Sequence, residues 1–176
     1  IVRGEADIEA IRAQLPGGVK IALDTSGSLF EKWARSGLVD FVKPNVKELG
    51  DAVGRELHTL GDVVDAAEEV ASWGVSYVMV SMGAGGVLGL ADHKVYWATC
   101  DPVSVHNTIG AGDASVSGFF NSHLRDPDGV GSAVAMAAQW GSQKVQQATS
   151  QLSHLNDLPA VRLHQSIDRH LPVVAD

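Results

Sequence analysis

The residues best suited to chemistry lie in a glycine-rich turn, Asn107-Thr108-Ile109-Gly110-Ala111-Gly112-Asp113. An apolar stretch precedes this turn and an apolar helical pattern follows it, so the turn is predicted to connect a strand to a helix. Glycines let successive backbone amides converge on a phosphate, and a helix N-terminus adds partial positive charge and unpaired N–H donors. The turn therefore predicts an anion-binding site.

Two other interpretations fit the residue types of this turn. In one, the glycines only make a tight turn and Asp113 only caps the helix. In the other, Gly110, Gly112 and Ser115 mimic the Gly-x-Gly-x-x-Gly fingerprint of dinucleotide-binding proteins, although a helix is predicted to follow in place of the next strand. A Walker A phosphate loop is excluded, because no Lys-Ser or Lys-Thr pair follows Gly112.

Two further motifs follow predicted buried strands. Asn45-Val46-Lys47-Glu48 comes after the apolar run Val39–Val42, at a strand end where open α/β sheets bind ligands. Its alternative is structural, since Asn45 and Glu48 are spaced to form a helix capping box. Ser81-Met82-Gly83-Ala84-Gly85-Gly86 follows another apolar run, and its alternative is a simple turn from a strand into a hairpin.

Together these motifs resemble those of the ribokinase-like (PfkB) sugar kinases. The resemblance implies that Asp113 is the catalytic base for the sugar hydroxyl and that the amides of Gly110, Ala111 and Gly112 form the anion hole. It also implies ATP and Mg²⁺ as cofactors, with Mg²⁺ held largely through water near Glu48. The nucleotide-binding residues that it implies are Asn45, Ser81, Gly83, Gly86, Thr108, Gly110, Gly112, Ala138, Gly141 and Ser142.

A narrower resemblance, to the 1-phosphofructokinase and tagatose-6-phosphate kinase branch, rests on Leu23–Gly27, Lys43-Pro44-Asn45, Ala98-Thr99 and the segment 138–142. The resemblance implies that the helix containing residues 138–142 lines the adenine pocket. Gln147-Ala148 stands where relatives often carry Pro-Gly, which alters the expected shape of that pocket. The branch implies a sugar phosphate as substrate, with fructose 1-phosphate converted to fructose 1,6-bisphosphate.

The apolar patterns and the resemblance predict an α/β, ribokinase-like fold, whose mostly parallel sheet is covered by helices and carries an antiparallel hairpin at one edge. The predicted strands span 19–23, 39–42, 77–82, 87–91, 94–99 and 103–108. The predicted helices span 8–15, 30–37, 59–74, 113–124, 130–145 and 159–171. No internal linker interrupts them, so residues 1–176 are expected to form one domain.

Composition narrows the class of protein. The hydrophobic fraction of 45% and the charged fraction of 19% are those of a globular protein. A formal charge of −8 and a pI near 5.2 argue against nucleic-acid and anionic-membrane partners. Cys100 is the only cysteine, which favours a reducing, cytoplasmic location. The histidines lack metal-ligand spacing, so a zinc site is not expected.

The PfkB kinases are longer than this chain, and their N-terminal half supplies the sugar-recognising residues and a lid. The chain also starts at Ile1 rather than at a methionine. We therefore expect a partial fold, the C-terminal nucleotide-binding part of a sugar kinase, with little turnover by itself and compatible with a homodimer at full length. The alternatives are a non-catalytic nucleotide- or phosphate-binding module and, after it, a dinucleotide-binding oxidoreductase.

Overall fold

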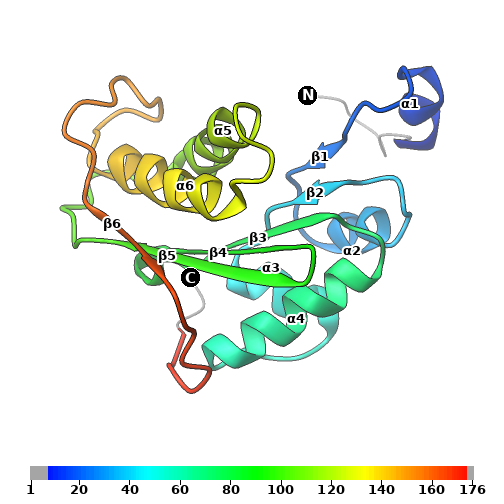
Figure 1. The fold of residues 1–176 in the computed structure, drawn as a ribbon, viewed down its shortest axis with the longest axis horizontal. Coiled ribbons are helices and arrows are strands. Elements are labelled where there is room, and N and C mark those ends of the chain that lie inside the picture. The colour runs from blue at the N-terminus through cyan, green and yellow to red at the C-terminus, as the bar shows by residue number, and fades with distance from the viewer. Residues whose placement is uncertain (1–7, 174–176) are drawn as a thin grey trace.

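The computed structural model describes residues 8–173, which form a six-stranded sheet with helices on both faces (Figure 1). The strands are β1 (Ala22–Leu23), β2 (Phe41–Val42), β3 (Tyr77–Ser81), β4 (Val87–Ala91), β5 (Lys94–Cys100) and β6 (Val161–His164). The helices are α1 (Ile8–Gln14), α2 (Ser28–Ala34), α3 (Val46–Val53), α4 (Leu60–Ser72), α5 (Ala111–His123) and α6 (Val130–Val145). Within these residues no helix is long and apolar enough to cross a bilayer.

Strands β1, β2 and β3 form the parallel part of the sheet. Val42 of β2 is in register with Leu23 of β1 and with Val78 of β3. The connection from β1 to β2 contains α2, and the connection from β2 to β3 contains α3 and α4. Because parallel strands end at the same edge of a sheet, the residues that follow these three strands are brought together there.

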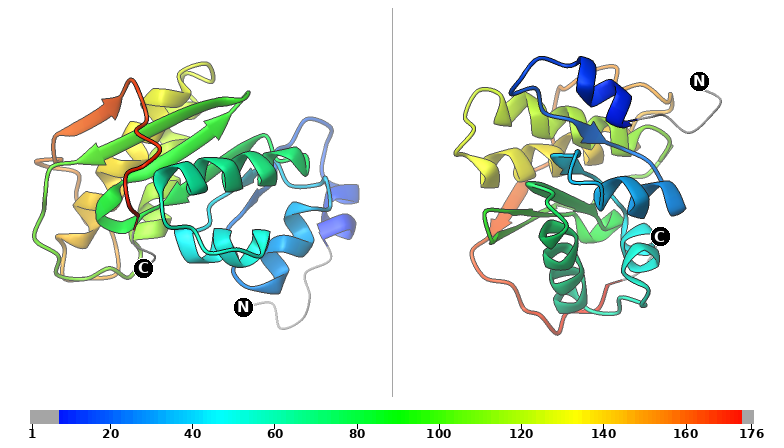
Figure 2. Two further views of the ribbon diagram at one scale, coloured as in Figure 1. Left: turned by 90° about the horizontal axis from the view of Figure 1, so that it is seen from below. Right: turned by 90° about the vertical axis from the view of Figure 1, so that its right-hand side faces the viewer.

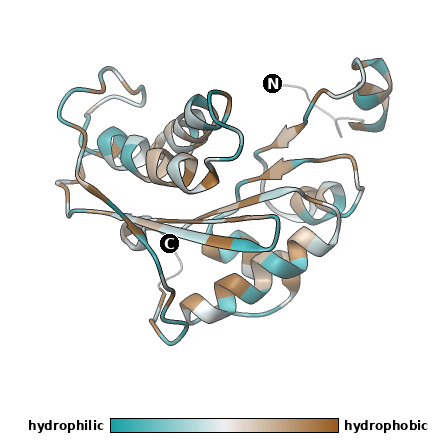
Figure 3. Ribbon diagram, viewed as in Figure 1, coloured by the Kyte–Doolittle hydropathy of each residue, from teal (hydrophilic) through white to brown (hydrophobic). Residues whose placement is uncertain are grey.

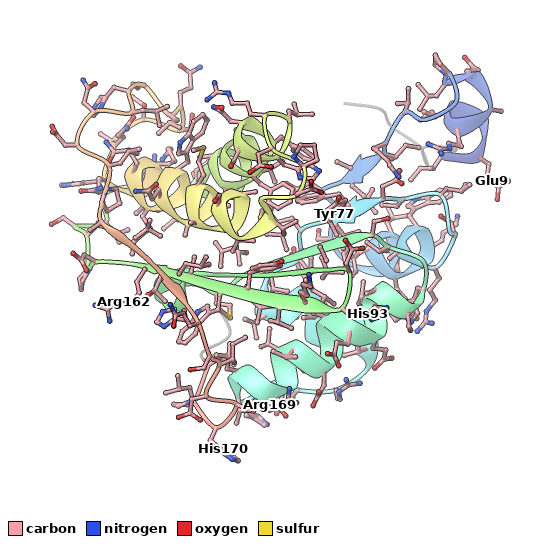
Figure 4. All side chains as sticks on the ribbon, viewed as in Figure 1. Glu9, Tyr77, His93, Arg162, Arg169 and His170 are labelled. Atoms are coloured by element: carbon pink, nitrogen blue, oxygen red, sulfur yellow. The ribbon has the colours of Figure 1, made fainter. Side chains whose placement is uncertain are left out.

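Strands β4, β5 and β6 form the antiparallel part. The turn between β4 and β5 places Asp92 and His93 at φ 48° and 59°, the left-handed conformation that suits a two-residue hairpin, and His93 marks the hairpin tip in Figure 4. Strand β6 pairs outside β5, so the hairpin lies between β3 and β6. The sheet is therefore mixed, with fewer parallel pairings than expected.

Both faces of the sheet are buried, which explains the continuous apolar runs in its strands. Helices α5 and α6 cover one face, and α3 and α4 lie against the other (Figures 1 and 2). Neighbouring strand residues alternate between the two cores: Phe41 and Met79 pack beneath α5 and α6, whereas Val42 and Val80 belong to the opposite core. Figure 3 shows hydrophobic colouring on β1 and β2 and hydrophilic colouring on much of the loop that follows α6.

The predicted helix over 159–171 is wrong, because its first residues form β6. Strand β5 would otherwise expose unpaired backbone groups, and β6 satisfies them by pairing Val161 with Cys100 and His164 with Trp97. The His164 ring also stacks on Trp97 with 3.8 Å between ring centroids. Beyond β6 the chain returns to α4, where Arg169 forms a 2.6 Å ion pair with Asp65 (Figure 4).

The predicted strand over 103–108 is also wrong. The backbone amides of His106 and Asn107 both donate to the carbonyl of Val145, at 2.7 and 3.1 Å, so this segment lies against the end of α6 and outside the sheet. Val105 is 62% exposed, which no central strand position would be. The segment before the glycine turn is therefore anchored to the end of α6 and is not part of a strand.

Helices α5 and α6 pack closely because glycines form their contact. A Cβ atom on Gly118 would lie 2.6 Å from the Met136 carbonyl oxygen and 3.0 Å from Cγ of Trp140. A Cβ atom on Gly141 would lie 2.3 Å from Oγ of Ser115. The distance between these helices, and with it the position of the start of α5, therefore depends on residues without side chains.

We expect Gly118→Ala to destabilise the chain by about 1–3 kcal/mol, because the added methyl group meets backbone that cannot move freely. Differential scanning calorimetry should then show a Tm lower by roughly 2–10 °C. Gly17→Ala is the matched control, since no atom lies within 4 Å of a Cβ built there. Equal melting temperatures for the two variants would contradict this account of the helix contact.

Candidate functional site

Segments that lie far apart in the sequence line one cavity of about 350 Å³, where β1, β2 and β3 end. The predicted site residues that line it are Asn45, Glu48, Ser81, Gly83, Gly86, Thr108, Ala111, Gly112, Ala138, Gly141 and Ser142. Gly110 and Asp113 lie beside this lining, next to Ala111 and Gly112 in the chain. A larger cavity of about 770 Å³ along α3 is lined by none of the predicted residues.

The glycine turn has the backbone geometry of a helix start. Gly110 is the N-cap of α5 with φ 86°, a left-handed conformation that favours glycine, and the amide of Ala111 donates to the Thr108 carbonyl at 3.1 Å. The Asn107 side chain stabilises the turn, because its Oδ1 accepts a hydrogen bond from the Ile109 amide at 2.9 Å. Among residues 8–173, the amides of Gly110 and Gly112 have no hydrogen-bond partner.

Asp113 is the third residue of α5 and does not occupy the cap position. Within the described part of the chain, its carboxylate makes no hydrogen bond or ion pair, whereas its backbone carbonyl accepts from Ser117. The side chain of Asp113 therefore does not cap α5, contrary to the structural alternative. The carboxylate is left available in the first turn of α5.

Asn45 and Glu48 do form the capping box that was the structural alternative for their motif. Asn45 Oδ1 accepts the Glu48 amide at 2.8 Å, and Glu48 Oε2 accepts the Asn45 amide at 2.9 Å. Both residues nevertheless line the cavity. The cap uses one carboxylate oxygen of Glu48, and the other has no partner among residues 8–173. The motif can thus begin α3 and still present oxygen to a ligand.

The Asn45 and Ser81 motifs are held side by side by backbone pairing. The two residues form a parallel bridge, and the Ser81 amide donates to the Pro44 carbonyl at 3.0 Å. The glycine loop that follows is fixed from the antiparallel side, where Nε1 of Trp97 donates to the Gly85 carbonyl at 2.9 Å. A Cβ atom on Gly86 would lie 2.0 Å from the Ala98 carbonyl oxygen, so only glycine fits at that position.

Lys43 also lines this cavity, although it is not among the site residues expected from the sequence. Its side chain is only 10% exposed, lines the cavity, and places Nζ 3.5 Å from Oδ1 of Asp24. A Cβ atom on Gly112 would lie 3.0 Å from this Nζ, so the lysine reaches the glycine turn. In the sequence this lysine belongs to the Lys43-Pro44-Asn45 element.

The lone thiol does not add a nucleophile to the site. Burial raises the pKa of Cys100, and a hydrogen bond from Ser142 only partly opposes that effect. A thiol with a raised pKa is mostly protonated at neutral pH and is a poor nucleophile. The chemistry of this cavity therefore rests on oxygen, amide and ammonium groups.

A model of the pfkB family of carbohydrate kinases matches residues 3–157. The chain belongs to the pfkB family. Among its relatives are the 1-phosphofructokinase of Rhodobacter capsulatus, 40% identical over 69% of this chain and 38% of the relative, and that of Haloferax volcanii, 36% identical over 86% of this chain and 48% of the relative. The pfkB resemblance expected from the motifs is confirmed.

Solved structures give the same picture of the fold. Phosphofructokinase-2 from Escherichia coli in complex with potassium superimposes with a TM-score of 0.72 and 31% identity, over 81% of this chain and 45% of that one. A putative phosphofructokinase from Staphylococcus aureus shares the fold with a TM-score of 0.74 at 19% identity. This pfkB chain spans about half the length of these relatives or less, so the expected partial fold is confirmed.

Proposed function

We propose that this chain is the nucleotide-binding part of an ATP- and Mg²⁺-dependent kinase that phosphorylates a hydroxyl of a sugar phosphate. Fructose 1-phosphate, with fructose 1,6-bisphosphate as the product, is the proposed reaction, supported by the similarity to 1-phosphofructokinases. One observation carries the proposal: both glycine loops, the Asn45 to Glu48 motif and α6 line a single cavity. In a dinucleotide-binding fold the helix after the glycine turn leads into another strand. Here α5 is followed by the helix α6, which gives no support to a dinucleotide-binding oxidoreductase.

In this proposal Asp113 is the base that takes the proton from the sugar hydroxyl while the hydroxyl oxygen attacks the γ-phosphorus and the bond to ADP breaks. Phosphoryl transfer depends mostly on positioning and on stabilising charge. The anion hole consists of the Gly110, Ala111 and Gly112 amides. Those of Gly110 and Gly112 have no partner within residues 8–173, whereas that of Ala111 would have to leave the Thr108 carbonyl.

Lys43 extends this anion hole by placing a positive charge next to Gly112. Its ion pair with Asp24 is 3.5 Å long, and Asp24 is 48% exposed, so the pair is loose enough for Lys43 to contact a phosphoryl oxygen. The proposed adenine side of the cavity is formed by Ala138, Gly141 and Ser142 of α6. In this arrangement the cavity presents positive charge to the phosphates of the nucleotide and small residues to its adenine ring.

Mg²⁺ fits the donors that the cavity supplies. Within the described residues no three His, Cys, Asp or Glu side chains surround a common point, so a fully protein-ligated ion is not what this site provides. Mg²⁺ prefers oxygen and keeps several waters, and the free carboxylate oxygen of Glu48 and the Asn45 side chain suit such water-mediated binding. Bound there, the ion would neutralise charge on the phosphates.

Mg-ADP and Mg-ATP should bind this chain with a measurable enthalpy in calorimetric titrations, because the residues proposed to contact the phosphates and the adenine line one cavity. Gly86→Ala should weaken this binding, because the added methyl group would collide with the Ala98 carbonyl and displace one wall of the cavity. If the folded wild-type chain binds neither nucleotide at millimolar concentration, the proposed nucleotide site is wrong.

In the full-length enzyme, Asp113→Asn should lower turnover by roughly 10²–10⁴-fold while Tm and nucleotide affinity stay close to the wild-type values. The amide is nearly isosteric with the carboxylate but cannot accept the proton. A coupled assay of ADP release measures turnover, and calorimetry on the same preparation measures stability and affinity. Unchanged turnover, or activity lost only in proportion to stability, would show that the base lies elsewhere.

A further inference from the structure

The most deeply buried charged side chain of the described residues is that of Lys144, in the last turn of α6. The residue is 0% exposed, and its Nζ donates to the Asn107 carbonyl at 2.9 Å. Its Cε would be 3.5 Å from a Cβ atom on Gly110. Lys144 therefore lies against the glycine turn, and it is not among the residues that line the cavity.

The glycine turn is tied to the end of α6 by several contacts besides this one. Asn107 Nδ2 donates to the Ala148 carbonyl at 2.9 Å, and the Asn107 amide donates to the Val145 carbonyl at 3.1 Å. A Cβ atom on Gly110 would lie 2.3 Å from the Ser150 carbonyl oxygen. These contacts fix the beginning of the turn. Of the groups that make them, only the Lys144 side chain is positively charged.

A buried lysine normally has a carboxylate partner, because an isolated charge in the interior is unfavourable. Within residues 8–173, Lys144 forms no ion pair, and Asn107 is its only hydrogen-bond acceptor. An ammonium group has three donors, so most of its capacity is unused. The glycine turn, whose amides are predicted to bind a phosphate, is in contact with this side chain.

We propose that Lys144 is a positioning residue of the phosphate site, with the bound phosphate as its counter-charge. It does not touch the ligand. It holds the Asn107 carbonyl, and so the path of the turn, and adds positive charge behind the amides of Gly110 and Gly112. This inference rests on the proposed function, because it needs a phosphate in the turn.

A purely structural role is the competing account. A cation in the last turn of a helix interacts favourably with the carbonyl end of that helix, and a buried methylene chain fills space. That account predicts lost stability without any selective effect on phosphate binding. Comparing a ligand that has phosphates with one that has none separates the two.

The test is Lys144→Met, which keeps the length and apolar volume of the side chain but removes the charge and the donors. By calorimetric titration we expect its affinity for Mg-ADP to fall about tenfold or more relative to wild type, the range for a lost charged hydrogen bond. Its affinity for adenosine should change less than about twofold, since adenosine has no phosphate to interact with the turn. Lys94→Met, at an exposed position in the hairpin, is the charge-matched control and should change neither affinity.

Lys144→Gln is the second variant, in case the methionine variant does not fold, and the same selective loss is expected. Equal losses for ADP and adenosine, or a lowered Tm with unchanged affinities, would reduce Lys144 to a structural residue and overturn the inference. If wild type itself binds no ADP, the proposed function fails, and the inference fails with it because it needs a bound phosphate. If wild type binds ADP and Lys144→Met binds it equally well, the inference alone is overturned.

Discussion

Two buried lysines lie close to the start of α5, and the proposed site depends on that arrangement. Lys43 reaches Gly112 from the end of β2, and Lys144 lies behind Gly110 from the end of α6. Glycine at both positions allows these close approaches. The chain as a whole carries a formal charge of −8, so an anionic ligand needs local positive charge. The two lysines and the helix N-terminus supply it at one point.

Structural and functional roles coincide in the Asn45 to Glu48 motif. The capping box begins α3, and the same two side chains line the cavity. A residue whose rotamer is fixed by a cap is already in place for a ligand, which reduces the entropy lost on binding. The two interpretations of this motif were therefore never exclusive, and finding the cap gives no reason to reject the site.

Much of the fold follows from sequence patterns because its strands are buried on both faces and its turns carry distinctive residues. The hairpin at Asp92-His93 and the helix over Val130–Val145 were predictable for that reason. The segments 103–108 and 159–171 were not, since their short apolar patterns are compatible with several structures, and tertiary contacts decided which one forms. Strand β6 forms because it satisfies backbone N–H and C=O groups of β5 that would otherwise be unpaired. Lys144 lies three residues after the buried Gly141, so the two share a face of α6, and this spacing would have predicted that Lys144 is buried. A lysine at such a position is nevertheless normally expected to be exposed.

The central claim is that separate segments of this chain form one phosphate and nucleotide site. Hydrogen–deuterium exchange with and without Mg-ADP tests it most directly, because the method reports every segment in one experiment. We expect slower exchange in the Ser81–Gly86 loop, the Asn107–Asp113 turn and the first turn of α3 at the same nucleotide concentration. Protection confined to the larger cavity along α3, with no change in either glycine loop, would contradict it.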